Sequence, residues 1–247
     1  MALSNLAQSR FLRLRKGAVM TSIGLCVAAL FVSQHVAHSS EAAVQIAPPA
    51  IDEPVTGAHQ ETAVLAGGCF WGVQGVFQHV NGVTKVVSGY SGGQADTAQY
   101  ETVSSGRTGH AESVQITYDP TKITYGRLLQ IYFSVAHDPT ELDHQGPDSG
   151  TQYRSAIFPA NDMQKRVAQS YIAQLDKAHA FPAPIVTRTD PLKGFYPAEG
   201  YHQNYLTLHP DSPYIAVNDL PKVENLKRLY PNLYRDQPVL VKVASSD

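Results

Sequence analysis

The sequence predicts an α+β domain, and its patterning and composition both support that class. Short β-rich runs, helical apolar spacings and glycine-containing loops occur in mixed order. They do not follow the regular strand–helix–strand rhythm of a parallel α/β protein. The 247 residues are 43% hydrophobic and 16% charged, which is typical of a globular chain long enough for one sizeable domain with extra segments.

The charge balance argues against nucleic acid as a partner. The chain carries 19 basic and 21 acidic residues, so its formal net charge is −2, and no block of like charge stands out. No repeat of fixed period is present, which disfavours solenoids and propellers.

The N-terminus has the layout of a secretory signal, which we place at residues 1–40. Basic residues between Arg10 and Lys16 precede an uncharged, mostly apolar run over 17–32, and small residues follow at 37–39 and 42–43. We therefore expect export, to the periplasm. The apolar run is slightly shorter than the roughly 20 residues of a membrane span, so an uncleaved membrane anchor is the alternative.

Residues 41–60 are rich in Ala, Pro and polar residues without a period, which is typical of a linker. We expect the folded domain to cover 61–235, beginning near Glu61, and a C-terminal tail to cover 236–247.

The first half of the domain predicts strands over 62–66 and 83–87 with a helix between them. That helix starts at Cys69, ends near 81–82 and carries apolar residues at helical spacing. A glycine-containing flexible loop is expected over 88–93, and clean alternation predicts a strand over 111–118.

In the second half, Thr124 is the expected N-cap of a helix that runs to Phe133. A loop over 137–150 and a strand over 152–158 follow. Asn161 and Gln164 resemble a capping box that opens a helix reaching Leu175. The remaining expectations are a strand over 184–187, a mixed aromatic and polar segment over 195–206, and a helix over 220–229 closed by Pro231.

Cys69 is a candidate nucleophile. The chain has two cysteines, and Cys26 falls in the signal, so the processed chain would hold one unpaired thiol. Cys69 follows a glycine pair at the start of a helix, where free N–H groups and the helix dipole favour the thiolate. Phe70 and Trp71 can wall a small apolar pocket beside it. A small buried hydrophobe is the alternative interpretation.

Glu112 is a candidate general acid because it shares the apolar face of its strand with Val114, Ile116 and Tyr118. A carboxyl turned toward a core has a raised pKa and can hold a proton at neutral pH. The alternative is that its head reaches water at the strand's end.

Three further residues lie in or beside glycine-containing loops, namely Tyr90, Asp148 and Tyr153. Tyrosine can donate a hydrogen bond while its ring walls a pocket. The chain has 13 tyrosines, and spacing alone does not single these out.

Two other function classes remain open on the residues alone. A cysteine hydrolase or acyltransferase would pair Cys69 with one of four histidines, namely His110, His137, His144 or His202. A non-catalytic module could instead hold methionine-like side chains with Trp71 and the tyrosines. No paired-ligand spacing supports a metal site.

Several ordered motifs together resemble the A-type peptide-methionine sulfoxide reductases, over roughly residues 61–234. The resemblance is carried by Gly67-Gly68-Cys69-Phe70-Trp71-Gly72, Gly89-Tyr90-Ser91-Gly92-Gly93, Thr108-Gly109-His110-Ala111-Glu112, Asp148-Ser149-Gly150-Thr151-Gln152-Tyr153-Arg154-Ser155 and the late block with Glu199-Gly200-Tyr201-His202-Gln203.

The resemblance implies a role for each matching residue. Cys69 would be the nucleophile and Glu112 the acid, while Phe70 and Trp71 would cradle the substrate methyl group. The residues that would assist binding and polarise the sulfoxide oxygen are Tyr90, Asp148 and Tyr153.

The same resemblance implies the fold and the reaction. The fold would be a two-layer α/β sandwich with a mixed, mainly antiparallel sheet and a ferredoxin-like core. The expected reaction is the thiol-dependent reduction of methionine S-sulfoxide, free and in oxidised proteins, which repairs proteins after oxidative stress. We expect no cofactor, no metal, no nucleic acid and a monomeric protein.

Two departures from the family pattern stand out. Gln74 replaces a glutamate that many relatives carry, a change of little consequence if Glu112 is the acid. The C-terminal tail lacks the recycling cysteines of many members. A sulfenic acid on Cys69 would therefore be reduced by an outside small thiol or a thioredoxin-like donor.

Overall fold

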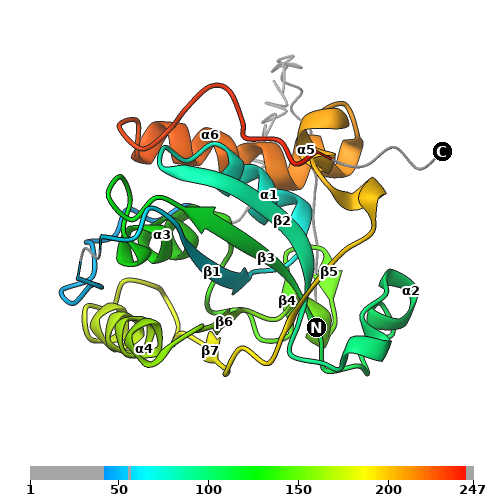
Figure 1. Ribbon diagram of the computed structural model, residues 1–247, viewed down its shortest axis with the longest axis horizontal. Coiled ribbons are helices and arrows are strands. Elements are labelled where there is room, and N and C mark those ends of the chain that lie inside the picture. Colours follow the sequence, from blue (N-terminus) through cyan, green and yellow to red (C-terminus); the bar gives the residue numbers. More distant parts are fainter. Residues whose placement is uncertain (1–41, 55–56, 243–247) are drawn as a thin grey trace, which may run out of the picture. The chain divides into compact units, whose positions relative to one another are not determined.

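The computed structural model describes residues 42–54 and 57–242, and its centre is a six-stranded mixed sheet (Figure 1). The strand order is β7-β6-β1-β3-β2-β8, and every neighbouring pair is antiparallel except β6 and β7. The strands are β1 (Glu61–Ala66), β2 (Val83–Ser91), β3 (Ala111–Tyr118), β6 (Ala156–Phe158), β7 (Arg188–Thr189) and β8 (Phe195–Pro197). A separate hairpin pairs β4 (His144–Gln145) with β5 (Asp148–Ser149).

The α-helices are α1 (Phe70–Gln78), α2 (Tyr100–Val103), α3 (Tyr125–Ile131), α4 (Asp162–Lys177), α5 (Tyr205–Leu208) and α6 (Leu220–Leu229). Two π-helical turns, Tyr132–Ala136 and Ile215–Asp219, follow α3 and precede α6. In Figure 1, α6 and α4 lie toward opposite edges of the sheet.

The connectivity confirms the predicted ferredoxin-like core. The elements β1, α1, β2, β3, α3 and β6 occur in this order along the chain, with α2 and the β4–β5 hairpin inserted, and their strands lie in the order β6-β1-β3-β2. This is a βαββαβ unit with a fully antiparallel sheet, to which β7 and β8 add an edge strand on each side.

Alternation along β1 separates two cores. Ala63 and Leu65 face the large core, which also takes apolar residues of α1, α3, α4 and α6. Val64 and Ala66 face a small cluster on the other side, with Phe158 and half-buried Leu192. The helices therefore cover one face of the sheet, as a two-layer α+β fold requires.

The predicted loop over 88–93 differs from the structure, because β2 continues to Ser91. Gly89 and Tyr90 pair with β3 on one side and with β8 on the other. A Cβ on Gly89 would collide with the Tyr196 carbonyl oxygen, so this glycine permits close approach of β8.

The predicted strand over 152–158 is only three residues long in the structure. Gly150 has a φ of 135°, and Thr151–Tyr153 forms a 3₁₀ turn before β6 begins at Ala156. The turn is closed by the Tyr153 N–H, which donates to the Gly150 carbonyl oxygen at 3.0 Å.

The two predicted helix N-caps are confirmed. Thr124 Oγ1 accepts from the Arg127 N–H at 3.3 Å at the start of α3. Asn161 Oδ1 accepts from the Gln164 N–H at 2.8 Å, and Gln164 Oε1 accepts from the Ala160 N–H at 3.0 Å. The start of α4 therefore resembles the predicted capping box, except that Gln164 reaches the N–H of the residue before the N-cap.

The stretch expected to be a linker has no helix or strand over 42–54, yet it packs against the domain. Ile46 is 7% exposed in the large core, and its carbonyl oxygen accepts from Gln130 Nε2 at 2.6 Å. The Tyr171 hydroxyl donates to the Ala47 carbonyl oxygen at 2.7 Å. Single side chains and backbone groups, rather than a regular helix or strand face, bind this stretch to α3 and α4. Its sequence therefore shows no period.

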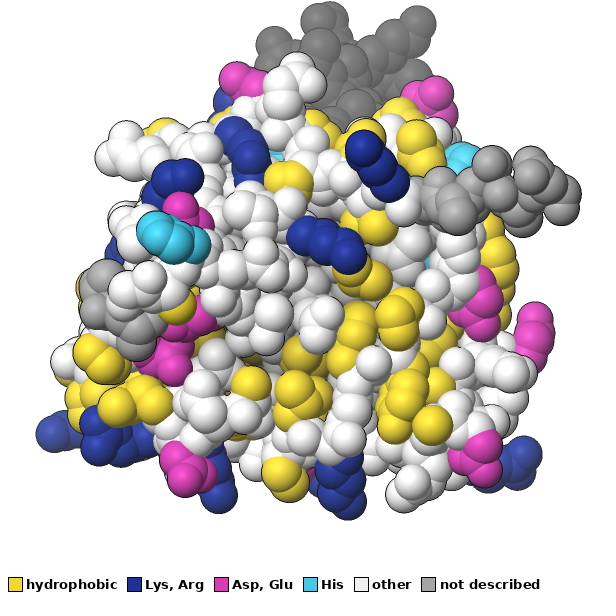
Figure 2. Space-filling model, in the orientation of Figure 1, with side chains coloured by type: hydrophobic (Ala, Val, Ile, Leu, Met, Phe, Trp, Pro, Cys, Tyr) yellow, Lys and Arg dark blue, Asp and Glu magenta, His cyan; other side chains and the backbone are white. Residues whose placement is uncertain are grey.

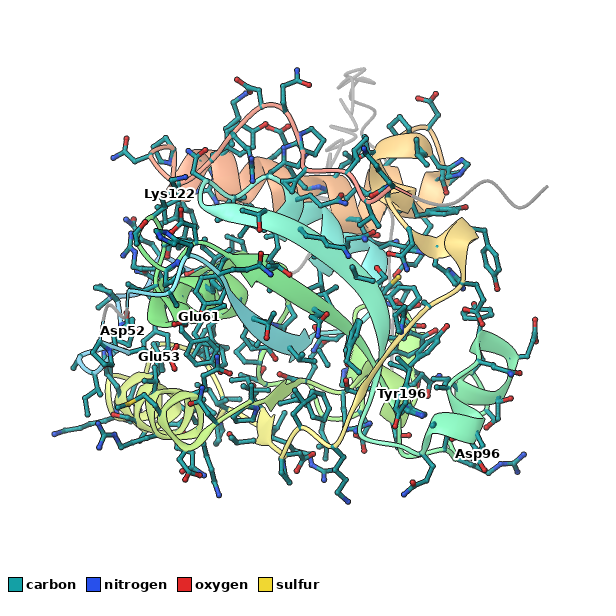
Figure 3. The ribbon with its side chains drawn as sticks, in the orientation of Figure 1. Asp52, Glu53, Glu61, Asp96, Lys122 and Tyr196 are labelled. Atoms are coloured by element: carbon teal, nitrogen blue, oxygen red, sulfur yellow. The ribbon has the colours of Figure 1, made fainter. Side chains whose placement is uncertain are left out.

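Asp52 ends this docked segment at the N-terminus of α3. Its Oδ1 accepts from the Gly126 N–H at 2.8 Å, so it satisfies an otherwise unpaired helix donor. Figure 3 shows Asp52 and Glu53 near Glu61, the first residue of β1. The Tyr118 hydroxyl donates to Glu61 at 3.0 Å, which adds a second tie in this region.

The predicted signal over 1–40, with its apolar run and Cys26, lies outside the described residues. Within 42–54 and 57–242, no helix is both long and apolar enough to cross a membrane. On the face in Figure 2, basic and acidic side chains are scattered among apolar ones rather than gathered by sign.

The packing of 44–52 predicts that the folded domain needs residues before Glu61. The free energy of unfolding of a protein that begins at Glu61 should be at least about 2 kcal/mol lower than that of one that begins at Ala42. The shorter protein lacks the buried Ile46 side chain and several hydrogen bonds. Urea unfolding measures the difference. Ile46→Ala in the longer protein is the matched control and should reproduce much of the loss; equal stability of the two lengths would show that the segment docks without contributing.

Candidate active site

Cys69 lies at the junction between β1 and α1, where it is the N-cap residue of the helix. The chain turns there through Gly67 and Gly68. Gly68 has a φ of 80°, and a Cβ on it would lie 2.7 Å from Gln145 Cβ, so glycine meets both a conformational and a steric demand. The turn places Cys69 at the edge of the large core, where the residue is 8% exposed.

The thiol of Cys69 differs from the expectation of a resting thiolate. Burial raises its pKa well above the ordinary value, and the carboxyl groups of Glu112, Asp219 and Asp148 raise it further. The backbone N–H of Trp71 lowers the pKa, but α1 has no side-chain capping hydrogen bond at its start. Burial, with the acidic neighbours second, therefore outweighs the helix N-terminus and favours the protonated thiol.

Glu112 lies on β3 beside the start of α1, buried at 4% exposure, as the strand alternation predicts. Its Oε2 accepts from the Phe70 N–H at 3.1 Å. Burial raises the pKa of Glu112 to about 8, the Phe70 hydrogen bond lowers it, and Asp148 and Asp219 raise it. This carboxyl holds a proton at neutral pH, next to the only cysteine among the described residues.

Tyr90 is paired with Glu112 across β2 and β3, and its ring lies 5.9 Å from the Phe70 ring. The Tyr90 hydroxyl donates to Glu199 Oε2 at 2.9 Å. Burial and this carboxylate raise the pKa of Tyr90. Tyr90 is therefore a neutral phenol whose proton is directed toward Glu199.

Asp148 and Tyr153 flank the other side of the site. The Tyr214 hydroxyl donates to Asp148 Oδ2. Burial raises the pKa of Asp148, while Tyr214 and Lys222 lower it. Burial also raises the pKa of Tyr153, and Glu112, Asp148 and Cys69 raise it further when they are ionised. These mutual effects place the predicted residues around one centre.

Arg154 fixes the turn that carries Tyr153. Its Nη1 donates to the His110 carbonyl oxygen at 3.0 Å, and its Nη2 donates to the Gly109 carbonyl oxygen at 2.8 Å. Those carbonyls immediately precede β3, so the buried guanidinium ties the Tyr153 turn to the strand that carries Glu112.

Trp71 is held in an aromatic cage that the sequence did not single out. Its ring stacks on Tyr205 at 3.9 Å and 11°, and it meets Tyr214 edge-on at 5.9 Å. Its Nε1 donates to His202 Nδ1 at 3.2 Å. Trp71 remains half-buried, which leaves part of the indole available to a ligand. The available signal was the late block around His202, which is rich in aromatic residues.

His202 packs in turn against Phe70 and Tyr100, with ring centroids at 5.0 and 4.6 Å. Because Nδ1 accepts from Trp71, the remaining proton of the neutral ring is on Nε2. Burial lowers the pKa of His202, and Glu199 raises it. Burial therefore disfavours the charged form of this imidazole, although Glu199 Oε2 lies 3.8 Å from its Nε2.

Another group missed by the sequence is a buried ion pair below α1. Lys222 Nζ lies 3.8 Å from Asp219 Oδ1, and both side chains are buried. A Cβ on Gly72 would collide with this carboxylate, so the pair lies directly against the first turn of α1.

The four histidines weighed as partners for Cys69 form other contacts. His137 Nε2 bonds the Ser155 hydroxyl at 2.7 Å, and burial lowers the pKa of His137 to about 3. His110 Nδ1 accepts from the Gly93 N–H at 3.2 Å, and His144 Nδ1 bonds the Leu142 carbonyl oxygen at 2.9 Å. Within the described chain no histidine is hydrogen-bonded to Cys69, so the geometry of a cysteine–histidine pair is absent there.

Residues 42–54 and 57–242 contain no group of three or more His, Cys, Asp or Glu residues arranged to hold a metal ion.

Comparisons with known proteins agree on one family. The family model described as peptide methionine sulfoxide reductase matches residues 61–233. A peptide methionine sulfoxide reductase MsrA 2 of Mesorhizobium japonicum is 70% identical over 186 residues, covering 75% of this chain and 95% of that protein. One of Synechocystis is 49% identical over 195 residues, covering 78% and 91%.

Solved structures give the same result. Reduced Mxr1 of Saccharomyces cerevisiae has a TM-score of 0.56 at 33% identity, over 64% of this chain and 91% of that one. Methionine sulfoxide reductase A of Corynebacterium diphtheriae has a TM-score of 0.53 at 34% identity, over 66% and 82%. With the matched family model and these relatives, the chain belongs to the peptide methionine sulfoxide reductase family.

Proposed function

We propose that this protein reduces the S epimer of methionine sulfoxide, free and within oxidised proteins, with Cys69 as nucleophile and Glu112 as general acid. The observation that carries the assignment is the buried Glu112 carboxyl on the Phe70 N–H, immediately beside Cys69. A sulfoxide needs a proton at oxygen as a thiol attacks sulfur. The site offers both groups, since Glu112 on β3 is hydrogen-bonded to the residue that follows Cys69.

The reaction balances with these two groups. The Cys69 sulfur attacks the substrate sulfur, and the proton of Glu112 moves to the sulfoxide oxygen. The thiol proton passes to the Glu112 carboxylate. The S–O bond of the substrate then breaks as the oxygen transfers to Cys69. The products are the thioether and a sulfenic acid; the substrate sulfur is reduced by two electrons and the Cys69 sulfur is oxidised by two.

A raised thiol pKa suits this sequence of steps. Because Cys69 is a thiol at rest, it is protected from adventitious oxidation until a substrate is bound. Once Glu112 has given its proton away, its carboxylate is the nearest base for the thiol proton. Glu112 therefore acts first as acid and then as base, which its pKa of about 8 allows.

The aromatic residues have binding roles in this proposal. Phe70 and Trp71 contact the apolar methyl group, and the cage of Tyr205, Tyr214 and His202 holds Trp71 in place. Tyr153 is half-buried within the electrostatic field of Glu112 and Cys69, a suitable position for hydrogen bonding to the sulfoxide oxygen. Tyr90 and Asp148 act indirectly, through Glu199 and Tyr214.

Recycling requires a thiol from outside the chain. The sequence contains no cysteine besides Cys26 and Cys69, and Cys26 belongs to the proposed signal. We propose that a small thiol or a thioredoxin-like protein attacks the Cys69 sulfenic acid, releases water and leaves a mixed disulfide. A second thiol then attacks that disulfide and restores Cys69. The protein acts as a monomer in this scheme.

Export to the periplasm is the proposed location. The basic residues before 17 and the apolar run over 17–32 support a cleaved signal, with an uncleaved anchor as the alternative.

Single-turnover chemistry tests the nucleophile. Without reductant, the protein beginning at Ala42 should release about one methionine per molecule and stop with a trappable sulfenic acid on Cys69. Mass spectrometry with a sulfenic-acid trap measures both quantities. Cys69→Ser is the matched control, which should bind the sulfoxide normally but release no methionine. Release of methionine by this variant would refute the mechanism.

Glu112→Gln should slow reduction by about 10²-fold or more, because the proton donor is lost. In the wild type the rate should fall as pH rises through about 8, where Glu112 deprotonates, and the variant should lack that limb. Stopped-flow single turnovers across pH measure both. A near-normal rate in the variant would transfer the acid role to a tyrosine.

The same substitution has a stability readout with a definite sign. Between the ordinary glutamate pKa and about 8, the unfolded chain binds fewer protons than the folded one. Folding stability contributed by Glu112 therefore falls as pH rises through that window. Glu112→Gln should be more stable relative to wild type at pH 9 than at pH 5, as measured by urea unfolding.

Fractionation of cells that express the full chain tests export. The processed protein should appear in the periplasmic fraction, with a new N-terminus near residues 38–43. Membrane-bound protein of full length would support the anchor instead, and intact soluble protein in the cytosol would contradict both.

A further inference from the structure

Four buried amide side chains lie next to the Trp71 cage and take no part in the proposed chemistry. They are Gln74 and Gln78 on α1 and the consecutive residues Gln203 and Asn204, which together we name the amide clamp. Neutral amides buried without partners would cost free energy, so their hydrogen bonds indicate what they hold together.

Within the amide clamp, α1 is bonded to the loop that follows β8. Gln74 Nε2 donates to Gln203 Oε1 at 3.0 Å, and Gln74 Oε1 accepts from the Asn204 N–H at 2.8 Å. One turn further along, Gln78 Nε2 donates to Asn204 Oδ1 at 2.8 Å. Residues four apart share one face of a helix, so α1 grips the loop at two successive turns.

Gln203 fastens that loop to the sheet. Its Nε2 donates to the Ser88 carbonyl oxygen at 2.9 Å, and its Oε1 accepts from the Ser88 N–H at 3.0 Å. The side-chain amide thus pairs with β2 in both directions, as a neighbouring strand would.

Asn204 makes the same two-way pairing with the C-terminal segment. Its Nδ2 donates to the Val241 carbonyl oxygen at 2.9 Å, and its Oδ1 accepts from the Val241 N–H at 2.9 Å. The Val239 N–H adds a bond to the Gln78 carbonyl oxygen at 3.0 Å. Residues 239–241 are therefore bonded to the amide clamp at both ends.

Asn204 also links this segment to the substrate cage. It follows His202 by two residues and directly precedes Tyr205, and both of those side chains contact Trp71. Its backbone is left-handed, with a φ of 60°, a conformation that asparagine adopts more readily than most residues, and its side-chain bonds support it there. The conformation between the two cage residues is thus secured from outside the loop.

We infer that residues 239–241 are a positioning element of the active site: through Asn204 they hold His202 and Tyr205 against Trp71 and so shape the methyl pocket. The inference rests on the proposed role of Trp71 in binding the substrate methyl group. It gives the cysteine-free C-terminal segment a task in substrate binding that is separate from recycling.

Truncation tests the segment directly. A chain ending at Pro238 loses residues 239–241, and a chain ending at Lys242 is the matched control because it keeps them. We expect the shorter chain to show a KM for a methionine sulfoxide peptide about 10-fold higher, from the loss of the bonds that fix the cage, with kcat changed far less. Asn204→Gly retains the left-handed backbone without the side chain and should give the same KM increase.

Trp71 is the only tryptophan of the chain and supplies a readout that is independent of catalysis. In the chain ending at Pro238 and in Asn204→Gly, its emission should shift to longer wavelength and acrylamide should quench it more strongly than in the control. Because both changes remove the two bonds between Asn204 and Val241, combining them should give less than the sum of the two effects. Thermal melts confirm that each protein is folded.

The outcomes separate the inference from the proposed function. Equal KM and equal Trp71 quenching in the two truncations would overturn the positioning role, as would additive effects in the combined variant. A quenching change without a KM change would also overturn it, while leaving the Cys69 mechanism untouched. If the chain ending at Pro238 fails to fold, Asn204→Gly alone decides between these results.

Discussion

The hydrogen bond from the Phe70 N–H to Glu112 Oε2, at 3.1 Å, is the contact on which the site depends. It joins the first turn of α1 to β3 and satisfies a helix donor that Cys69 does not cap. It also keeps a carboxyl buried next to a thiol. Burial raises the pKa of Glu112 because it disfavours the charged carboxylate, and this hydrogen bond lowers the pKa. The resulting pKa is about 8. A strand carboxyl and a helix cysteine therefore become one proton-transfer unit.

The electrostatics around that unit are more negative than the sequence suggested. Burial is the main cause that raises the pKa of Cys69, and Asp219, Asp148 and, once it is ionised, Glu112 raise it further. Lys222 lies 3.8 Å from Asp219 and lowers the pKa of Asp148. Stabilisation of a thiolate by the helix N-terminus was therefore the wrong prediction for the resting protein. The location of Cys69 was predicted correctly, but the charge state depends on residues 43 to 150 positions away.

Local signals predicted the parts of the fold that local forces determine. The alternation of β3 matched its bounds and the burial of Glu112, and Thr124 and Asn161 cap their helices as expected. The cage and the amide clamp could not be read in this way. Trp71 and His202 are 131 residues apart, and Gln78 and Asn204 are 126 apart. No period or cap marks such pairs, because the fold alone brings them together.

The docked segment over 44–52 has a consequence for the order in which the molecule assembles. Its hydrogen bonds reach residues 84 and 124 positions later in the chain. Closing such long loops is slow compared with forming a helix or a hairpin. During synthesis these residues emerge first, yet their binding surface on α3 and α4 is completed only when residue 177 has left the ribosome. The beginning of the domain can therefore dock only after most of the chain has been made, although it is synthesised first.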